Sequence, residues 1–198
     1  MMNDIIIKNE VFCMINLKHC GSQIMETNRL ILRPFKIEDA DDMFNNWASN
    51  DNVTKYLTWP THTNIEITKF ILSEWVKTYE DIKTYHWAIV LKQTNEVIGD
   101  ISIVGMDESI ASCELGWCMS EKYWGQGIMP EAALKVRDFL FDEVGFNRVS
   151  ARHDTNNPKS GRVMEKIGMK YEGTCRKAAK NNQGLCDIAI YAILKEDR

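Results

Sequence analysis

The sequence predicts an α+β domain built on one mostly antiparallel sheet. Three strand-like runs, at residues 86–92, 97–104 and 111–119, are separated by short turns of the kind that join antiparallel strands. A glycine-rich turn then leads into a long helical pattern at 128–144, and another strand-like run follows at 147–153. Because a helix that connects two strands allows them to pair in parallel, we expect a mixed sheet.

The remaining elements complete this α+β pattern. A first strand is expected at residues 29–35, where Leu30 and Leu32 alternate with more polar positions, and two strands are expected near 169–177 and 186–194. Four helices should flank the sheet, at residues 38–47, from Thr63 or Asn64 to about Ile82, at 128–144 and at 158–167. The second helix carries an aromatic and aliphatic stripe that we interpret as core packing, formed by Ile67, Phe70, Ile71, Trp75, Val76 and Tyr79.

Composition is that of an ordinary globular domain. The 198 residues are 44% hydrophobic and 26% charged, and the net charge is −4. An acidic chain is a poor candidate for nucleic-acid binding and mildly favours a cationic amine as substrate. No apolar run approaches the roughly 18 residues of a membrane span, and charges interrupt the N-terminal run at Ile5–Ile7, which makes it a poor signal peptide.

The six cysteines form no C-x-x-C pair and no zinc-ligand spacing. We therefore predict reduced thiols in a cytoplasmic protein and expect no metal.

The most informative segment is the turn at residues 123–131, which lies between a strand and a helix. Gly125 and Gly127 lack a Cβ, so the backbone can curl tightly. The free N–H groups of the turn and of the first helical turn are suited to an anion such as phosphate. No lysine follows Gly127, and position 130 is a proline, which excludes the nucleoside-triphosphate and dinucleotide glycine motifs. A plain turn remains the alternative interpretation.

Three further segments accompany this turn: residues 27–33 with 37–40, the helix start at 157–160 that runs on to 166–168, and the two C-terminal strands. In this order the segments resemble the GNAT superfamily of acetyl-CoA-dependent N-acetyltransferases, especially the ribosomal-protein alanine N-acetyltransferases. The resemblance covers roughly residues 26–195. It implies one N-acetyltransferase domain at residues 25–198, preceded by an extension at 1–24 that lies outside the family pattern.

The resemblance also implies a site for acetyl-CoA. In GNAT folds the strand before the glycine turn and the strand after the following helix splay apart, and the pantetheine arm lies in the gap. Carried over, the cofactor-binding residues are Trp117, Cys118, Met119, Trp124, Gly125, Gln126, Gly127, Ile128, Met129, Asn157 and Ser160.

Two of these positions depart from the family pattern Gln/Arg-x-x-Gly-x-Gly/Ala, because Trp124 and Met129 stand at its ends. Asn157 and Ser160 also have a purely structural interpretation, since an asparagine before a proline is a good helix N-cap.

The acceptor site is less well defined by the sequence. In the family the connection between the first two helices helps to wall it, which makes Trp59 and His62 candidate substrate contacts.

Acetyl transfer to an amine requires a neutral amine, a donor for the tetrahedral oxyanion and a proton for the leaving thiolate. Neither catalytic pair known in the family is complete here. Arg152 and Met164 occupy the positions of one Glu–Tyr pair, and Ser160 matches the serine of a second pair whose glutamate falls at Ala179. We predict Glu114 and Ser160 as the catalytic residues, with Ser160 as the donor to the thiolate. A structural role for the Glu114 carboxylate is equally open.

Three further candidates for catalysis are Asp187, Tyr191 and His153, of which the last two have plainer structural interpretations. The predicted function is acetyl transfer to a primary amine by direct attack in a ternary complex. The acceptor is a protein N-terminal amine or a small molecule such as a polyamine, amino acid or aminoglycoside. A non-catalytic acyl-CoA-binding module is the non-enzymatic alternative. Association of two copies into a homodimer also stays open.

Overall fold

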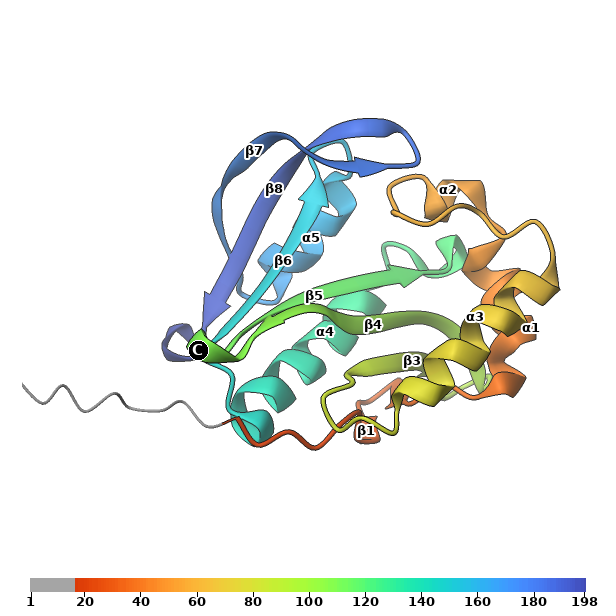
Figure 1. Cartoon of the computed structure of the whole chain (residues 1–198), viewed down its shortest axis with the longest axis horizontal. Coiled ribbons are helices and arrows are strands. Elements are labelled where there is room, and N and C mark those ends of the chain that lie inside the picture. Colours follow the sequence, from red (N-terminus) through yellow and green to blue (C-terminus); the bar gives the residue numbers. More distant parts are fainter. Residues whose placement is uncertain (1–16) are drawn as a thin grey trace, which may run out of the picture.

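Eight strands form one sheet in the computed structural model, which describes residues 17–198 (Figure 1). Their order across the sheet is β1-β2-β3-β4-β5-β6-β8-β7, and only β5 and β6 are parallel neighbours. The strands are β1 (Met25–Glu26), β2 (Leu30–Arg33), β3 (His86–Leu91), β4 (Glu96–Asp107), β5 (Ser112–Met119), β6 (Arg148–Asp154), β7 (Lys170–Asn181) and β8 (Gly184–Leu194). The prediction of an α+β fold with a mostly antiparallel mixed sheet is confirmed.

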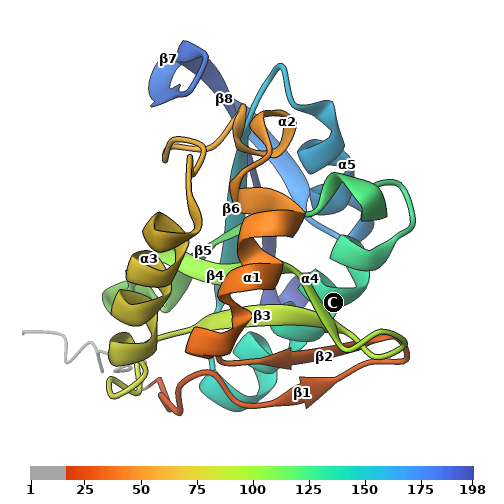
Figure 2. The same cartoon turned by 90° about the vertical axis from the view of Figure 1, so that its right-hand side faces the viewer.

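Five α-helices cover the two faces of the sheet. They are α1 (Ala40–Met43), α2 (Asp51–Thr54), α3 (Ile65–Thr78), α4 (Ile128–Phe139) and α5 (Pro158–Lys166). Figure 2 shows α1 and α3 next to each other. These two helices contribute to the core on one face, and α4 and α5 contribute to the core on the other.

The strand alternation of β3 shows how both faces acquire a core. Trp87 and Ile89 pack on the α4 side, whereas Ala88 and Val90 pack on the α1 side. Successive side chains of a strand point to opposite faces, so a continuous apolar run is buried on both sides. All four residues are at most 1% exposed.

The segment predicted as a single helix at 38–47 is more varied. It begins as a 3₁₀ turn at Ile37–Asp39, continues as α1 and ends in a π-helical turn at Phe44–Ala48. The short helix α2 was not predicted. Asn50 caps it, because its side chain accepts a hydrogen bond from the N–H of Asn52 at 2.9 Å.

The helix predicted from Asn64 is confirmed as α3, whose N-cap is Asn64. The interpretation of its apolar stripe as core packing is wrong for Ile67 and Phe70, which are 37% and 63% exposed. The two buried residues of α3 are Thr68 and Leu72. The helix is therefore turned so that part of its apolar stripe faces solvent.

The strands β5 and β6 separate along their length. Their pairing covers only residues 112–115 of β5 and 148–151 of β6. Beyond this point β5 continues to Met119 and β6 to Asp154 as neighbours of β4 and β8 alone. Figure 1 shows β6 turning away from β5, so the edge of β5 at residues 116–119 lies along a gap between the two strands.

The described part of the predicted N-terminal extension lies against the domain. Gly21 donates its N–H to the carbonyl of Ile82 at 2.7 Å, and Lys18 donates to Val144 at 2.8 Å. Residues 1–16, including Cys13 and the apolar run at 5–7, lie outside the described residues. The domain boundary at residue 25 stays a prediction.

The five cysteines in the described part of the chain are free thiols, at positions 20, 113, 118, 175 and 186. Among the helices of residues 17–198, none has the length and hydropathy needed to cross a bilayer.

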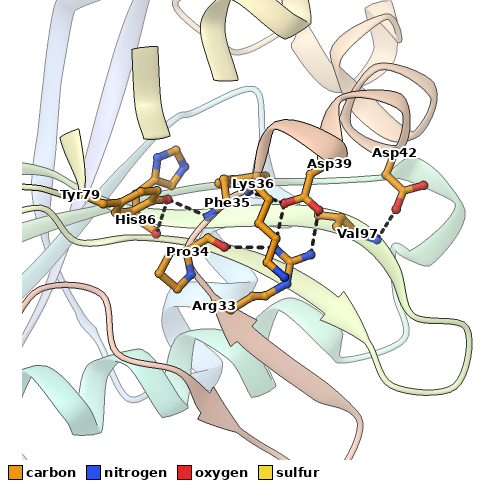
Figure 3. Close-up of polar contacts among 9 residues, drawn as sticks. All are labelled: Arg33, Pro34, Phe35, Lys36, Asp39, Asp42, Tyr79, His86 and Val97. Carbon is orange, nitrogen blue, oxygen red and sulfur yellow. Dashed lines mark hydrogen bonds and ion pairs between the residues drawn. The ribbon is translucent and has the colours of Figure 1, made fainter. Parts of the chain in front are cut away.

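A compact polar network ties β2 to the start of α1 (Figure 3). The guanidinium of Arg33 donates to both carboxylate oxygens of Asp39 at 2.7 Å, and the N–H of Lys36 donates to the same carboxylate at 2.8 Å. Tyr79 extends the network by accepting from the N–H of Phe35 at 3.0 Å and donating to the carbonyl of His86 at 2.9 Å. Burial is the main reason that the pKa of Tyr79 rises to about 12, so its hydroxyl stays protonated.

We predict that Asp39→Ala destabilises the fold by about 3 kcal/mol, because it leaves a mostly buried guanidinium without its counter-ion. The side chains of Arg33 and Asp39 are 18% and 8% exposed. Urea unfolding followed by tryptophan fluorescence measures the change. The control is Glu66→Ala, which removes a solvent-exposed pair with Lys69 and should destabilise the fold far less. Equal losses of unfolding free energy in the two variants would contradict a stabilising role for the Arg33–Asp39 ion pair.

Candidate active site

The turn between β5 and α4 presents free backbone donors. Gly125 and Gly127 adopt φ values of 76° and 72°, in the left-handed region that favours glycine, and Gly127 is the N-cap of α4. Within the described residues, none of the N–H groups of 125–129 has a hydrogen-bond partner. Free N–H groups at the positive end of a helix dipole form a binding site for an anion.

Arg29, which directly precedes β2, clamps this turn. Its Nη1 donates to the carbonyl of Gln126 at 3.0 Å, and its Nε donates to Glu131 Oε2 at 2.6 Å. Thr27 Oγ1 donates to Glu131 Oε1 at 2.6 Å. Burial alone would raise the pKa of Glu131, but the hydrogen bonds from Thr27 and Arg29 outweigh it and lower that pKa. The ion pair neutralises Glu131, which would otherwise repel an anion at the helix start.

The free edge of β5 offers further polar groups to the gap. The N–H of Ser120 donates to the carbonyl of Ile98 at 2.8 Å and so points toward β4. Backbone groups two residues apart point to the same edge of a strand. The backbone N–H and C=O groups of Trp117 and Met119 therefore point away from β4, into the gap between β5 and β6. The carbonyl of Met119 accepts from the indole Nε1 of Trp124 at 2.9 Å, which fixes the glycine turn to the strand end.

The start of α5 lies across this gap. Asn157 is the N-cap residue, as predicted, but its side chain makes no capping hydrogen bond. In residues 17–198 the hydroxyl of Ser160 has no hydrogen-bond partner either, although its N–H donates to the carbonyl of Asn157 at 3.1 Å. The ammonium of Lys159 lies 4.2 Å from the centre of the Trp124 ring, so α5 and the glycine turn are in direct contact.

A cleft of about 520 Å³ lies on the sheet face that carries α3. Its walls come from α3, the loop at residues 57–59 and strands β3 and β4, and Gly116, Trp117 and Cys118 of β5 also line it. These β5 residues belong to the stretch whose free edge faces the gap. The cleft and the gap therefore meet at one segment of one strand.

Of the two predicted acceptor contacts, Trp59 lies in the cleft wall and His62 is buried behind it. Trp59 lines the cleft. His62 is buried, its Nδ1 is 2.8 Å from Thr68 Oγ1, and its ring lies 5.3 Å from that of Trp59. Burial lowers the pKa of His62. His62 therefore packs against Trp59 in the cleft wall and against Thr68 in the first turn of α3.

A bridge from the β7–β8 hairpin holds the same loop. The side-chain amide of Asn182 donates to the carbonyls of Thr54 at 2.9 Å and Trp59 at 2.8 Å, and its N–H donates to Leu57 at 3.2 Å. A hairpin more than 120 residues away along the chain thus holds the loop that lines one side of the cleft.

The cleft contains a polar group that sequence reasoning missed. Asp100 of β4 lies beside His86 of β3, with 3.0 Å between Oδ2 and Nε2, and beside Cys118, with 2.7 Å between Oδ1 and Sγ. Burial raises the pKa of Cys118 well above the usual thiol value, and the Asp100 carboxylate adds to the rise. The signal in the sequence that could have revealed Asp100 is its position as one acidic residue within the apolar run at 97–104.

The predicted catalytic residues are not brought together. Glu114 lies in the part of β5 that still pairs with β6, and its Oε1 is 2.9 Å from Nε of Arg152. Ser160 lies at the start of α5 on the other side of the sheet from the cleft. Asp187 accepts from the N–H of Lys177 at 2.8 Å, and the rings of His153 and Tyr191 lie 5.7 Å apart.

Within residues 17–198, no group of three or more His, Cys, Asp or Glu side chains could hold a metal ion.

Comparison with known proteins identifies the chain as an acyltransferase. The family described as "Acetyltransferase (GNAT) domain" matches residues 29–170 of the chain. The uncharacterized N-acetyltransferase YoaA of Bacillus subtilis is 30% identical over 172 residues, which cover 87% of this chain and 97% of YoaA. The chain belongs to the GNAT acetyltransferase family, and the resemblance stated above is confirmed.

Solved structures share the fold. The GNAT-family acetyltransferase of Bacillus anthracis is 27% identical, with a TM-score of 0.77, and covers 88% of this chain and 99% of its own. The ribosomal-protein-S5-alanine acetyltransferase of Vibrio fischeri has a TM-score of 0.78 at 22% identity, covering 89% of this chain and 98% of its own. MccE, the microcin C7 self-immunity acetyltransferase solved with acetyl-CoA and AMP, has a TM-score of 0.76 at 20% identity, covering 91% and 99%.

We predict a pH-dependent contribution of Glu131 to stability. Its pKa is lower in the folded protein than in the unfolded chain, so its contribution is complete above the usual carboxyl pKa of about 4.3 and is lost as the pH falls through the lower folded value. Glu131→Gln should cost about 1 kcal/mol at pH 7 because it weakens charge-assisted, partly exposed hydrogen bonds.

Urea unfolding of the protein and of Glu131→Gln at several pH values measures this difference. The two unfolding free energies should converge as the pH falls below the lowered folded-state pKa of Glu131. A difference that stays constant over the whole range would rule out the ion pair as its source.

Proposed function

We propose that the protein transfers the acetyl group of acetyl-CoA to a primary amine by direct attack in a ternary complex. The observation that carries this proposal is the double role of β5 at residues 116–118. One side of this stretch lines the cleft, and its free edge faces the gap between β5 and β6. An amine in the cleft and a thioester in the gap would meet at this segment.

The free donors around the gap fit acetyl-CoA. The N–H groups of residues 125–129 suit the pyrophosphate, and Pro130 removes no donor that the phosphate needs. The unpaired backbone groups of Trp117 and the N–H of Met119 suit the amides of the pantetheine arm, since one extended chain can pair with another. The uncapped side chain of Asn157 is a further partner for the arm.

Acetyl-CoA supplies the activated acetyl group as a thioester. A β5 N–H in the gap would stabilise the oxyanion that forms on the carbonyl. The free hydroxyl of Ser160 would donate to the departing sulfur. Glu114 is our proposed base, although its pair with Arg152 occupies one carboxylate oxygen and it lies two residues before Gly116, the first β5 residue that lines the cleft. A water molecule would then have to relay the proton.

Cys118 supports direct attack over an acyl-enzyme. It is the one thiol that lines the cleft. The thiolate is the nucleophilic form of cysteine, and burial of the thiol, followed by the Asp100 charge, raises the pKa of Cys118 well above its usual value. The thiol is therefore a donor to Asp100 rather than a nucleophile.

The favoured acceptor is the N-terminal amine of a protein. The structural likeness to the ribosomal-protein-S5-alanine acetyltransferase of Vibrio fischeri supports this choice. The cleft runs from the 57–59 loop to Lys83 and Thr84, beyond α3, which suits an extended chain. The competing acceptor is a small cationic amine, favoured by the enclosed carboxylate of Asp100. A cytoplasmic location belongs to the same proposal.

Thiol release from acetyl-CoA, measured with a panel of N-terminal peptides, polyamines, amino acids and aminoglycosides, tests the proposal, with a calorimetric acetyl-CoA titration beside it. Turnover with one amine class is the expected result. Tight binding of acetyl-CoA without turnover of any amine would instead favour a non-catalytic binding module.

We predict that Gly127→Glu weakens acetyl-CoA binding by about 100-fold or more, because a carboxylate beside the pyrophosphate costs several kcal/mol. Calorimetric titration measures the dissociation constant.

The matched control is Gly145→Glu. Gly145 also has a positive φ, 94°, with nothing within 4 Å of an added Cβ, and it lies at the far end of the α4 segment. Both variants bear the backbone strain of a glutamate in the left-handed region, but only Gly127→Glu changes the charge at the turn. Similar dissociation constants for the two variants would overturn the phosphate assignment.

A further inference from the structure

Asp100 is a carboxylate in an unusual setting. It lies in the middle of β4 between Gly99 and Ile101, and its side chain is only 12% exposed. Its two recorded side-chain partners are the imidazole of His86 and the thiol of Cys118, one on each oxygen. A carboxylate accepts about four hydrogen bonds, so both oxygens keep the capacity to accept another.

Asp100 has no permanent counter-ion in the described part of the chain. Within residues 17–198 no lysine or arginine nitrogen lies within 4 Å of its oxygens. Lys83 lines the same cleft, but its ammonium is paired with Glu108 at 2.6 Å. Removing a charged carboxylate from water is costly unless a cation compensates for it. A cationic ligand in the cleft would supply that compensation.

The surrounding walls suit an organic cation. Trp59, Trp75 and Trp117 line the cleft, and the ring of Trp75 packs at 4.4 Å against that of His86. Aromatic rings attract ammonium groups through their faces and bury the apolar part of a ligand.

The position of Asp100 relates it to the proposed chemistry. Asp100 pairs in register with Cys118, at the stretch of β5 that borders the gap. Neighbouring strands lie about 4.8 Å apart. A cation held by Asp100 is therefore one strand away from the free backbone groups of Trp117 and the N–H of Met119.

We propose that Asp100 binds the acceptor as its ammonium ion, that His86 and Cys118 hold the carboxylate in position, and that acceptors are primary amines whose ammonium adjoins an apolar or aromatic group. This inference rests on the proposed function, because it concerns the acceptor side of the same site. Asp100 determines which amines bind, and His86 and Cys118 act through Asp100 as positioning residues. Before attack, the bound ammonium passes its proton through the relaying water to Glu114, the proposed base.

The first test is direct binding of 2-phenylethylammonium and of its neutral analogue 2-phenylethanol, followed by tryptophan fluorescence. The wild-type protein should bind the ammonium more tightly than the alcohol. Asp100→Asn keeps the shape of the side chain and removes its charge, so it should weaken ammonium binding at least 10-fold and leave binding of the alcohol unchanged.

The matched control is Asp107→Asn on the same strand, where the carboxylate is exposed and bonded to Ser109. This variant should bind both probes as the wild type does. If Asp100→Asn binds the ammonium as tightly as Asp107→Asn, or if the wild type does not prefer the ammonium over the alcohol, the proposal is overturned.

His86 provides a second variant. The Nε2 of glutamine can replace the imidazole Nε2 as donor to Asp100, so His86→Gln should raise KM for the amine less than His86→Ala, with kcat and the acetyl-CoA dissociation constant little changed. A loss of kcat or of acetyl-CoA affinity that is equal in the two variants would show a merely structural role for His86.

The two proposals fail separately. Ammonium binding that depends on Asp100, without turnover of any amine, would remove acetyl transfer and keep the cation site. Turnover with an unchanged KM in Asp100→Asn would keep acetyl transfer and remove the cation site.

Discussion

The separation of β5 from β6 is the constraint on which the rest of the site depends. Only residues 112–115 of β5 pair with β6, and the strand then runs on with one edge free. In a continuous sheet these backbone groups would be satisfied by the neighbouring strand. Here they are available to a ligand, and the helix that crosses between the two strands begins with free N–H groups at the same end of the gap.

The proposed cofactor side and acceptor side of the site lie on different parts of the sheet. The gap, the glycine turn and the start of α5 form the side that suits a nucleotide thioester. The cleft under α3 forms the side that suits an amine, and its polar centre is Asp100 with His86 and Cys118. Both sides are rigidly attached to the same strand, because β5 pairs with β4 over its whole length.

Much of the fold could be predicted from the sequence because its elements have clear periodicity and clear ends. The glycine turn before α4, the cap at Asn64 and the alternation in β2 are local patterns, and each led to the element that the structure contains. The stripe on α3 was misinterpreted at Ile67 and Phe70, because spacing along a helix does not reveal how far the sheet extends beneath it.

The polar centre of the cleft could not be predicted in the same way. His86, Asp100 and Cys118 come from three strands, and only the register of β3 with β4 and of β4 with β5 brings them together. The proposed base and thiolate donor, Glu114 and Ser160, were inferred from positions along the chain, and the structure leaves them on different sides of β5. Local sequence reveals a turn or a cap, whereas convergence across strands depends on long-range pairing.

The Asn182 bridge has a consequence for how this scaffold diversifies. One side of the cleft consists of the 54–59 loop held by the tip of the β7–β8 hairpin, and neither segment forms part of the glycine turn or the gap. Changes in the length or sequence of these two segments alter the acceptor wall without disturbing the groups that suit acetyl-CoA. The scaffold thus separates a constant half from an exchangeable half, and acceptor preference can drift between relatives while the acetyl donor stays the same.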